Sequence, residues 1–397
     1  MMGAPRVYGW RRASVSAVMG IMLLSGCAWE SGPRPPASTT RAALSVSAAR
    51  ELVPTAIPGS AVSVLQVNHT TWMTMATSHG LAVRTWTKGV AQAVVTLPIP
   101  LSCVAAGTLL HLGPVIGVAG CTAIWTPQGT TWEALRLPAV LMPEAMAGVG
   151  SDWSLLSIGA GAAGSQEVSI WHSTTAGHTW IRVGTSGMGL TSPAPGTPPF
   201  YGDKTGLAMA SRHDLWLTGS VAGGILLDRS EDTGGEWQSV SIPVPAVWAG
   251  AELASYPPIF ATAQRGYLPV SVDSRHFTGL AIYETRPPQE AWRLAGAIST
   301  SLAVALSNEW TLGTAGTSAV WLVLPHQVWQ STDRVRHWRV ALRLAAPWTI
   351  MDISFSGAHD GALLAVRRQG TPPTSVDYAL WQTVNGGQTW TAVSSRA

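Results

Sequence analysis

The sequence is poor in charged residues. Asp, Glu, Lys and Arg make up 11% of the 397 residues, against about 25% in an ordinary globular protein. The formal net charge of +3 is too small to indicate a nucleic-acid-binding protein. Hydrophobic residues account for 46%, which excludes disorder for most of the chain. After the N-terminal region, no uninterrupted apolar run reaches the ~18 residues that a membrane-spanning helix needs.

Motifs for common enzyme chemistry are missing as well. The sequence contains no G-x-x-x-x-G-K-[ST], no H-E-x-x-H and no G-x-S-x-G. Gly159–Gly164 matches G-x-G-x-x-G, but a strand-like segment follows it, and no acid lies between Glu167 and Asp203. A glycine-rich loop between strands explains this match. There is no C-x-x-C, and the ten histidines are scattered, so we expect no metal and no cofactor. His172 and His178 are interpreted as loop residues.

Phenylalanine and tyrosine are scarce, whereas tryptophan is abundant. The chain has 20 Trp against 4 Phe and 6 Tyr, and such an excess is typical of a residue with a fixed place in a repeated unit. Three segments fit Ser/Thr-x-polar-x-Gly-x-x-Trp, and a fourth has Val335 in place of the glycine. The positions that define these four segments are Ser173, Gly177 and Trp180; Ser230, Asp232, Gly234 and Trp237; Ser331, Asp333 and Trp338; and Thr383, Asn385, Gly387 and Trp390.

These segments resemble the Asp-box, the bacterial neuraminidase repeat. The resemblance implies that each segment is the hairpin loop between the outer two strands of a β-propeller blade. The residue types suit such a loop: an Asp or Asn side chain bonds loop N–H groups, and glycine permits the positive φ of a tight reversal. The tryptophan then begins the returning strand. Among Asp-box propellers, the chain most resembles the non-catalytic bacterial exports akin to photosystem II stability and assembly factors.

The tryptophan spacing extends this frame over the chain. Trp86, Trp132, Trp180, Trp237, Trp292, Trp338 and Trp390 follow one another at intervals of 46 to 57 residues, close to one four-stranded blade each. Strand-like stretches recur before the loops at Asp152–Gly159, Asp214–Gly219 and Asn308–Gly313. No segment shows a sustained 3.6-residue apolar period. We therefore predict an all-β fold, a seven-bladed β-propeller of four-stranded antiparallel blades over residues 61–397. The alternative is a tryptophan-rich pair of β-sandwiches with chance spacing.

The N-terminus has the features of a targeting segment. Three arginines and no acid precede an apolar stretch that is too short to span a membrane as a mature helix. It ends in Leu24-Ser25-Gly26-Cys27, which resembles the lipobox of bacterial lipoproteins. The resemblance implies removal of residues 1–26, lipidation of Cys27 and a location on the extracytoplasmic side of the membrane. Residues 27–60, rich in Pro, Ser and Thr, would form a flexible tether. The alternative is a simple secretory signal with a chance cysteine.

Two further cysteines remain, Cys103 and Cys121. An even pair in an oxidising compartment predicts a disulfide. Both cysteines lie in segments that are interpreted as strands. The alternative is two buried free thiols.

The function suggested by the resemblance is non-catalytic: a lipid-anchored scaffold that binds a protein, peptide or glycan on a propeller face. The alternative is a glycoside hydrolase of the cell envelope, similar to sialidases or glucanases. Glycoside cleavage usually requires two facing carboxylates, yet residues 52–132 contain no Asp or Glu. Asp273, Glu309, Asp352 and Asp360 are the acids that could approach a central face. Two long inter-strand loops, at Tyr201–Lys204 and Ala246–Ala249, are candidates for a binding surface. The oligomeric state is left open.

Overall fold

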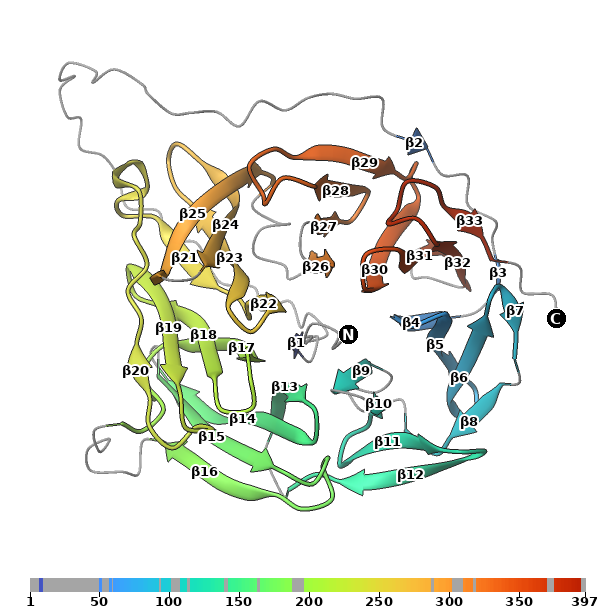
Figure 1. Ribbon diagram of the computed structural model, residues 1–397, viewed down its shortest axis with the longest axis horizontal. Coiled ribbons are helices and arrows are strands. Elements are labelled where there is room, and N and C mark those ends of the chain that lie inside the picture. Colours follow the sequence, from blue (N-terminus) through green and yellow to red (C-terminus); the bar gives the residue numbers. More distant parts are fainter. Residues whose placement is uncertain are drawn as a thin grey trace.

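The computed structural model describes residues 7–9, 50–51, 57–58, 60–92, 94–100, 108–112, 115–138, 142–162, 165–187, 196–286, 289–301, 310–316, 319–369 and 375–393. Seven antiparallel sheets follow one another around a ring, in the order of the sequence (Figure 1). The predicted all-β, seven-bladed propeller is therefore confirmed. The described residues contain no α-helix, and their single 3-10 turn is η1 (Ala246–Trp248). None of them forms a helix long and apolar enough to span a membrane.

Each blade runs from an inner strand near the axis of the ring to an outer strand at its rim (Figure 1). Blade 1 consists of β4 (Ser60–Val67), β5 (Thr70–Thr77) and β6 (Gly80–Thr87), with β7 (Val90–Ala91) and β8 (Val95–Leu97) sharing its outer edge. Blade 2 consists of β9 (Leu109–Leu112), β10 (Val115–Ala119), β11 (Ala123–Gln128) and β12 (Thr131–Arg136). Blade 3 consists of β13 (Met142–Val149), β14 (Asp152–Ala162), β15 (Ser165–Ser173) and β16 (Ile181–Ser186). Blade 4 consists of β17 (Asp203–Met209), β18 (Leu215–Val221), β19 (Gly224–Ser230) and β20 (Gln238–Ser239).

The remaining three blades complete the ring. In blade 5 the inner strand has two pieces, β21 (Glu252–Ser255) and β22 (Ile259–Thr262), followed by β23 (Arg265–Asp273), β24 (Thr278–Arg286) and β25 (Gln289–Ser299). Blade 6 consists of β26 (Thr311–Ala315), β27 (Ala319–Leu324), β28 (Gln327–Ser331) and β29 (Arg339–Arg343). Blade 7 consists of β30 (Trp348–Ser356), β31 (Asp360–Gln369), β32 (Ser375–Thr383) and β33 (Thr391–Ala392).

The hydrophobic core lies between the blades rather than inside one layer. The described residues form seven apolar clusters, and each cluster joins two successive blades. Central strands are covered on both faces, so they read as continuous apolar runs; residues 266–272 of β23 are all buried. Aromatic rings meet across several of these interfaces: for example, Trp216 packs edge-on against Trp292 with centroids 5.4 Å apart, and Trp321 stacks on Phe355 at 5.0 Å.

The ring closes between blade 7 and blade 1. Asp352 Oδ2 of β30 accepts hydrogen bonds from the Ser63 hydroxyl (3.2 Å) and the Val64 N–H (3.3 Å) of β4. A short strand before blade 1, β3 (Ile57–Pro58), also pairs with β32, on which the C-terminal β33 pairs as well. Strands from both ends of the propeller thus hold the last blade.

Two more short strands precede the propeller. β2 (Arg50–Glu51) runs parallel to β29 at the rim. β1 (Val7–Gly9) pairs with the inner strand β13, near the middle of the ring in Figure 1. β1 belongs to the segment predicted to be a signal peptide, and cleavage before Cys27 would remove it from the mature protein.

Two details of the predicted frame differ from blade to blade. Trp86 lies in β6, before the turn at residues 88–89, whereas the other tryptophans of the frame follow their turns. Asp152–Gly159 and Asp214–Gly219 fall on second strands, but the described part of Asn308–Gly313 belongs to the first strand of blade 6. A first strand and a second strand each offer a tryptophan an apolar position, so the spacing of the stretches does not tell the two strands apart.

Candidate functional site

The four predicted loops lie between the third and fourth strands of blades 3, 4, 6 and 7, and they share one hydrogen-bond pattern. The hydroxyl at the first position accepts the N–H of the fifth residue: Gly177 to Ser173 (2.9 Å), Gly234 to Ser230 (2.8 Å), Val335 to Ser331 (2.8 Å) and Gly387 to Thr383 (2.9 Å). The side-chain oxygen at the third position accepts the N–H of the seventh: Thr179 to Thr175 (2.9 Å), Glu236 to Asp232 (2.8 Å), His337 to Asp333 (3.0 Å) and Thr389 to Asn385 (2.9 Å). Each of these side-chain oxygens thus accepts a hydrogen bond from a backbone N–H of its own loop.

The fifth position of each loop has positive φ. The value is 86° at Gly177, 104° at Gly234 and 81° at Gly387, the region that favours glycine. Val335 adopts 69° although it is β-branched, a conformation that is rare for such a residue. Its side chain is fully buried in the cluster between blades 5 and 6, so apolar burial offsets the backbone strain.

The loop tryptophans differ in burial. Trp237 and Trp338 are buried, and the indole N–H of Trp237 donates to the carbonyl of Gly234 at 2.9 Å. Trp180 and Trp390 are half-buried and lie at the margins of their clusters. Burial of the tryptophan is therefore not uniform among the four loops.

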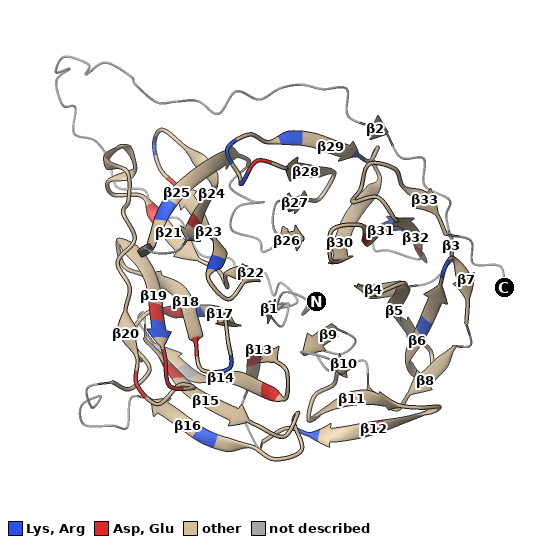
Figure 2. Ribbon diagram, viewed as in Figure 1, with Lys and Arg blue, Asp and Glu red and all other residues tan. Residues whose placement is uncertain are grey.

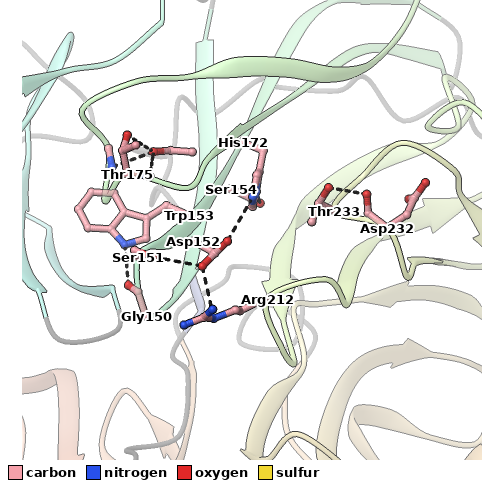
Figure 3. A network of polar contacts seen from close by, with 12 residues as sticks. Gly150, Ser151, Asp152, Trp153, Ser154, His172, Thr175, Arg212, Asp232 and Thr233 are labelled. Atoms are coloured by element: carbon pink, nitrogen blue, oxygen red, sulfur yellow. Dashed lines mark hydrogen bonds and ion pairs between the residues drawn. The ribbon is translucent and has the colours of Figure 1, made fainter.

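A buried polar network lies beside the loop of blade 3 (Figure 3). The Ser154 hydroxyl is 3.0 Å from His172 Nδ1. Asp152 Oδ1 is 3.7 Å from His172 Nε2, and Asp152 Oδ2 is 3.5 Å from Nε of Arg212 in blade 4. His172 was interpreted as a loop residue; it lies instead in β15, and its side chain is buried.

This network has the residue types of a hydrolase triad but not its accessibility. Ser154, His172 and Asp152 are 0%, 3% and 7% exposed, so a substrate has no path to the serine. Burial lowers the pKa of His172, which the charge of Asp152 opposes. The network therefore ties β14 to β15, while the exposed Arg212 links blade 3 to blade 4.

An open pocket lies at the rim of blade 4. It has a volume of about 350 Å³, at the lower end of the range for ligand sites. Its walls are mostly aliphatic, from the end of β18, from β19 and from the linker that follows β20: Val221, Ile225, Leu226, Leu227, Val240, Ile242 and Val244. Tyr201, Asp228, Ser239 and Ser241 complete the lining.

The rim of this pocket carries exposed apolar side chains. Tyr201 is 46% exposed and Val244 40%; Val247, which follows in η1, is 46% exposed as well. They come from the linkers before and after blade 4, because prolines 243 and 245 carry the chain away from the sheet after Val240 donates its N–H to Leu227. The outer strand β20 therefore ends early. It pairs only with Asp228 and Arg229, and the first half of β19 has no strand paired along its outer edge.

Two charged groups are buried beneath the rim. Lys204 and Asp228 are each 4% exposed. The Lys204 ammonium donates to the carbonyls of Tyr201 (2.6 Å) and Gly202 (3.0 Å). Asp228 Oδ1 accepts the Ser239 hydroxyl at 2.7 Å. Burial lowers the pKa of Lys204 to about 8, opposed by Asp228 and Asp203. Burial raises the pKa of Asp228, opposed by Ser239 and Lys204.

Charged residues occupy few positions along the described strands (Figure 2). Of the acids considered for a central face, Asp352 binds blade 1 across the closure, Asp360 lies 3.2 Å from His69, and Asp273 accepts the Thr278 hydroxyl. Glu309 lies outside the described residues. Within the described part of the chain, no group of three His, Cys, Asp or Glu could hold a metal ion.

The sequence pointed to part of the pocket. Of the two loops suggested as binding surfaces, Tyr201–Lys204 contributes Tyr201 to the lining, whereas Ala246–Ala249 forms η1 and its flank and contributes none of it. Trp248 of the same loop is instead buried and stacks on Phe277 at 5.5 Å. Asp228 was not singled out. The sequence did contain a signal for it: Asp228 directly follows the apolar run Ile225–Leu227 within an expected strand, where an acid is unusual.

The cysteine predictions fall largely outside the described residues. Cys27 and Cys103 are not described. Cys121 is disulfide-bonded, and both cysteines that could be its partner lie outside the described part of the chain, so the pairing with Cys103 stays a prediction. Cys121 itself lies in the exposed turn between β10 and β11 rather than in a strand.

No protein-family model matches the chain, and no curated protein matches it. Several solved structures are similar in fold. The β-propeller domain of the Trilobed protease from Pyrococcus furiosus aligns with a TM-score of 0.52 and 7% identity, over 85% of this chain and 99% of that one. A puromycin-hydrolysing peptidase from Mycobacterium tuberculosis aligns with 0.51 and 9%, over 85% of this chain and 53% of that one.

An acylaminoacyl peptidase from Pyrococcus horikoshii gives a TM-score of 0.51 and 8% identity, over 85% of this chain and 52% of the peptidase. This chain thus spans about half the length of the two peptidases. At such low identity the likeness shows the propeller fold and nothing of the chemistry.

Proposed function

We propose that the protein is a lipid-anchored β-propeller on the extracytoplasmic side of a bacterial membrane, where it acts as a non-catalytic binding or assembly scaffold for a protein, peptide or glycan. The observation that carries this proposal is the rim pocket of blade 4. It combines an apolar recess with the exposed side chains of Tyr201 and Val244, which lie on linkers rather than in the sheet. Propeller linkers can vary without disturbing the blades, so they are suited to recognition.

The polar residues of the four loops support a structural rather than a catalytic role. Their hydroxyl, carboxylate and amide oxygens accept N–H groups of their own loops. The same pattern in four blades supports membership of the Asp-box propellers, and within them of the non-catalytic branch similar to photosystem II stability and assembly factors. The buried position of the Ser154–His172–Asp152 network argues in the same direction.

Anchoring rests on the sequence motif Leu24–Cys27 and the tether that follows it. Because β2 and β3 pair with the propeller, the tether would be the roughly twenty residues between Cys27 and β2, and such a length would let the propeller turn toward partners in the envelope. A membrane-bound scaffold needs nothing more from the chain than a site on its surface.

The anchor is tested by labelling cells with an alkyne fatty acid. The wild-type protein should incorporate the label and sediment with membranes. Cys27→Ser should lose the label and appear in the soluble fraction. Membrane association of Cys27→Ser that survives a salt wash contradicts the lipoprotein interpretation.

The binding role is tested by crosslinking the wild-type protein to its neighbours in cells and comparing two variants. Val244→Asp places a charge at the pocket rim and should abolish the crosslinked species. Val384→Asp is the matched control, because Val384 is 75% exposed but lies in the loop of blade 7; it should keep them. Equal crosslinking of both variants, or none with the wild type, contradicts the proposal.

A further inference from the structure

The carboxylate of Asp228 has unused capacity to accept hydrogen bonds. It is 4% exposed and lines the rim pocket of blade 4. Among the described residues its side chain accepts one hydrogen bond, at Oδ1 from Ser239, whereas an ionised carboxylate has about four acceptor sites. The second oxygen is not among the described polar atoms that are sealed from solvent without a partner, so a donor that enters the pocket can reach it. The second oxygen therefore marks a place for a donor that the described chain does not supply.

The nearby lysine does not fill this place. The Lys204 ammonium is held by the carbonyls of Tyr201 and Gly202, where it fixes the turn that carries the Tyr201 ring at the rim. Its charge acts on Asp228 and Asp203 from a distance. Asp228 lines the pocket and Lys204 does not, so a donor that enters the pocket meets the carboxylate and not the ammonium. A cationic donor is attracted to this site, and an anion is repelled.

The shape and lining of the pocket restrict the donor further. The lining around Asp228 is mostly aliphatic, with Val221 and Leu226 from the cluster between blades 3 and 4, and Ile225, Val240 and Ile242 from the cluster between blades 4 and 5. A recess of about 350 Å³ accommodates a single side chain rather than a folded element. The Ser239 and Tyr201 hydroxyls, 3.4 Å apart, lie at the mouth and can accept further N–H groups. An aliphatic stem that ends in an ammonium matches each of these surfaces.

We propose that this pocket takes a primary ammonium group on a short aliphatic stem, presented as a lysine side chain by a protein partner. The stem packs against the aliphatic walls, and the ammonium donates to Asp228 and to the hydroxyls at the mouth. An uncharged sugar hydroxyl gains little from the negative site, and the three donors of an ammonium suit the scattered acceptors better than a planar guanidinium does. The inference rests on the proposed binding function, which it narrows to one class of partner group.

The direct test uses small probes on the full-length protein at pH 7. Titration with n-butylammonium, followed by NMR or calorimetry, should show saturable binding. 1-Butanol and butyrate have similar size but lack the cation, and they should bind at least tenfold more weakly. Asp228→Asn should weaken butylammonium at least tenfold, while Asp203→Asn, on an exposed carboxylate outside the lining, should change it less than threefold. Equal binding of butanol, or unchanged binding by Asp228→Asn, overturns the inference.

A second measurement separates a protein lysine from a free amine and does not depend on any variant. A short apolar peptide with one central lysine should bind the wild-type protein more tightly than the same peptide with acetyl-lysine, by at least tenfold. Tighter binding of cadaverine than of the lysine peptide would assign the pocket to free polyamines and overturn the partner assignment.

The crosslinking experiment distinguishes failure of this inference from failure of the proposed function. If Val244→Asp loses the crosslinked partner and Asp228→Asn retains it, the rim docks a partner without an ammonium, and only the inference fails. If both variants retain the partner, the binding role of this rim fails as well. Loss in both variants, with Val384→Asp unaffected, supports both.

Discussion

Blade 4 contains two aspartates four residues apart that behave in opposite ways. Asp232, in the loop after β19, is exposed, and its Oδ1 accepts the Ser230 hydroxyl (2.7 Å) and the Glu236 N–H. Burial alone would raise its pKa, but these hydrogen bonds lower it below the ordinary value. Asp228, within β19, is buried with one hydrogen bond, and burial raises its pKa.

The difference separates structural from binding carboxylates. At Asp232 the chain itself supplies the donors, so the charged form stabilises the loop and has nothing left for a ligand. At Asp228 burial removes part of the hydration and the chain returns one hydrogen bond, from Ser239, so the charged form costs free energy that a further donor would offset. A carboxylate that destabilises its own fold is a better indicator of a binding site than one in a repeated motif.

The largest expected difference between the two ends of blade 4 is in stability. Trp237→Ala removes a buried indole at the loop end, together with its hydrogen bond to Gly234, and should lower the free energy of unfolding by about 3–5 kcal/mol. Tyr201→Ala at the pocket end removes a half-exposed ring and should change it by no more than about 0.5 kcal/mol. Urea unfolding followed by circular dichroism measures both.

The two variants should rank in the opposite order when pocket binding is measured instead of stability. Tyr201→Ala should weaken n-butylammonium at the pocket, and Trp237→Ala, studied at a temperature where it stays folded, should not. A stable Trp237→Ala that has lost pocket binding would mean that the two ends of the blade are coupled, and the separation drawn above would be wrong.

Glycines at the two ends provide a smaller and sharper contrast. Gly234 has φ 104°, and an added Cβ would lie 3.1–3.3 Å from Val183, Ile170 and Leu215. Gly223, in the turn before β19, has φ 73° with no atom within 4 Å. Gly223→Ala should cost only the left-handed backbone, about 1 kcal/mol, whereas Gly234→Ala adds crowding and should cost about 2–3 kcal/mol. Thermal melts of the two variants check this; equal losses would show that the neighbours of Gly234 relax.

Much of the fold could be predicted because the repeat consists of residues with strong local conformational preferences. The hydroxyl, the polar third residue, the glycine and the tryptophan of Ser230–Trp237 each have one favourable place in a hairpin, and they recur often enough to count blades. Val335 shows the limit of such a pattern. The same backbone forms there without glycine, because burial between blades compensates for a local misfit that sequence alone cannot weigh.

The candidate site could not be predicted to the same degree, because it depends on where chain segments separate. Tyr201, Asp228 and Val244 are spread over 44 residues, and they meet only because β20 ends after two residues and the linker leaves the sheet. No local preference encodes that gap. The suggestion of Tyr201–Lys204 came from loop length, and it identified the rim without the buried carboxylate beneath it.

The smallest expected effect is the pH dependence of stability, and it has opposite signs at the two aspartates. The folded pKa of Asp232 lies below the ordinary value of 3.8, so its contribution is present above that pH and is lost as the pH falls through the folded pKa. The folded pKa of Asp228 lies above 3.8, so the folded state binds its proton first, and stability is recovered as the pH falls through that raised pKa toward 3.8.

Replacement by Asn should reveal these signs against the wild type. Asn385 occupies the corresponding position in blade 7 and keeps the loop hydrogen bond, so Asp232→Asn should fold and lose about 1 kcal/mol or less at pH 7. Asp228→Asn should gain stability at pH 7. The difference in stability between each variant and the wild type should shrink toward zero in acid. For Asp228→Asn this should happen at a higher pH than for Asp232→Asn. Urea midpoints from pH 7 to pH 3 measure this. A loss of stability in Asp228→Asn at pH 7 would mean that its charge is already satisfied within the chain, and its carboxylate would then be as structural as that of Asp232.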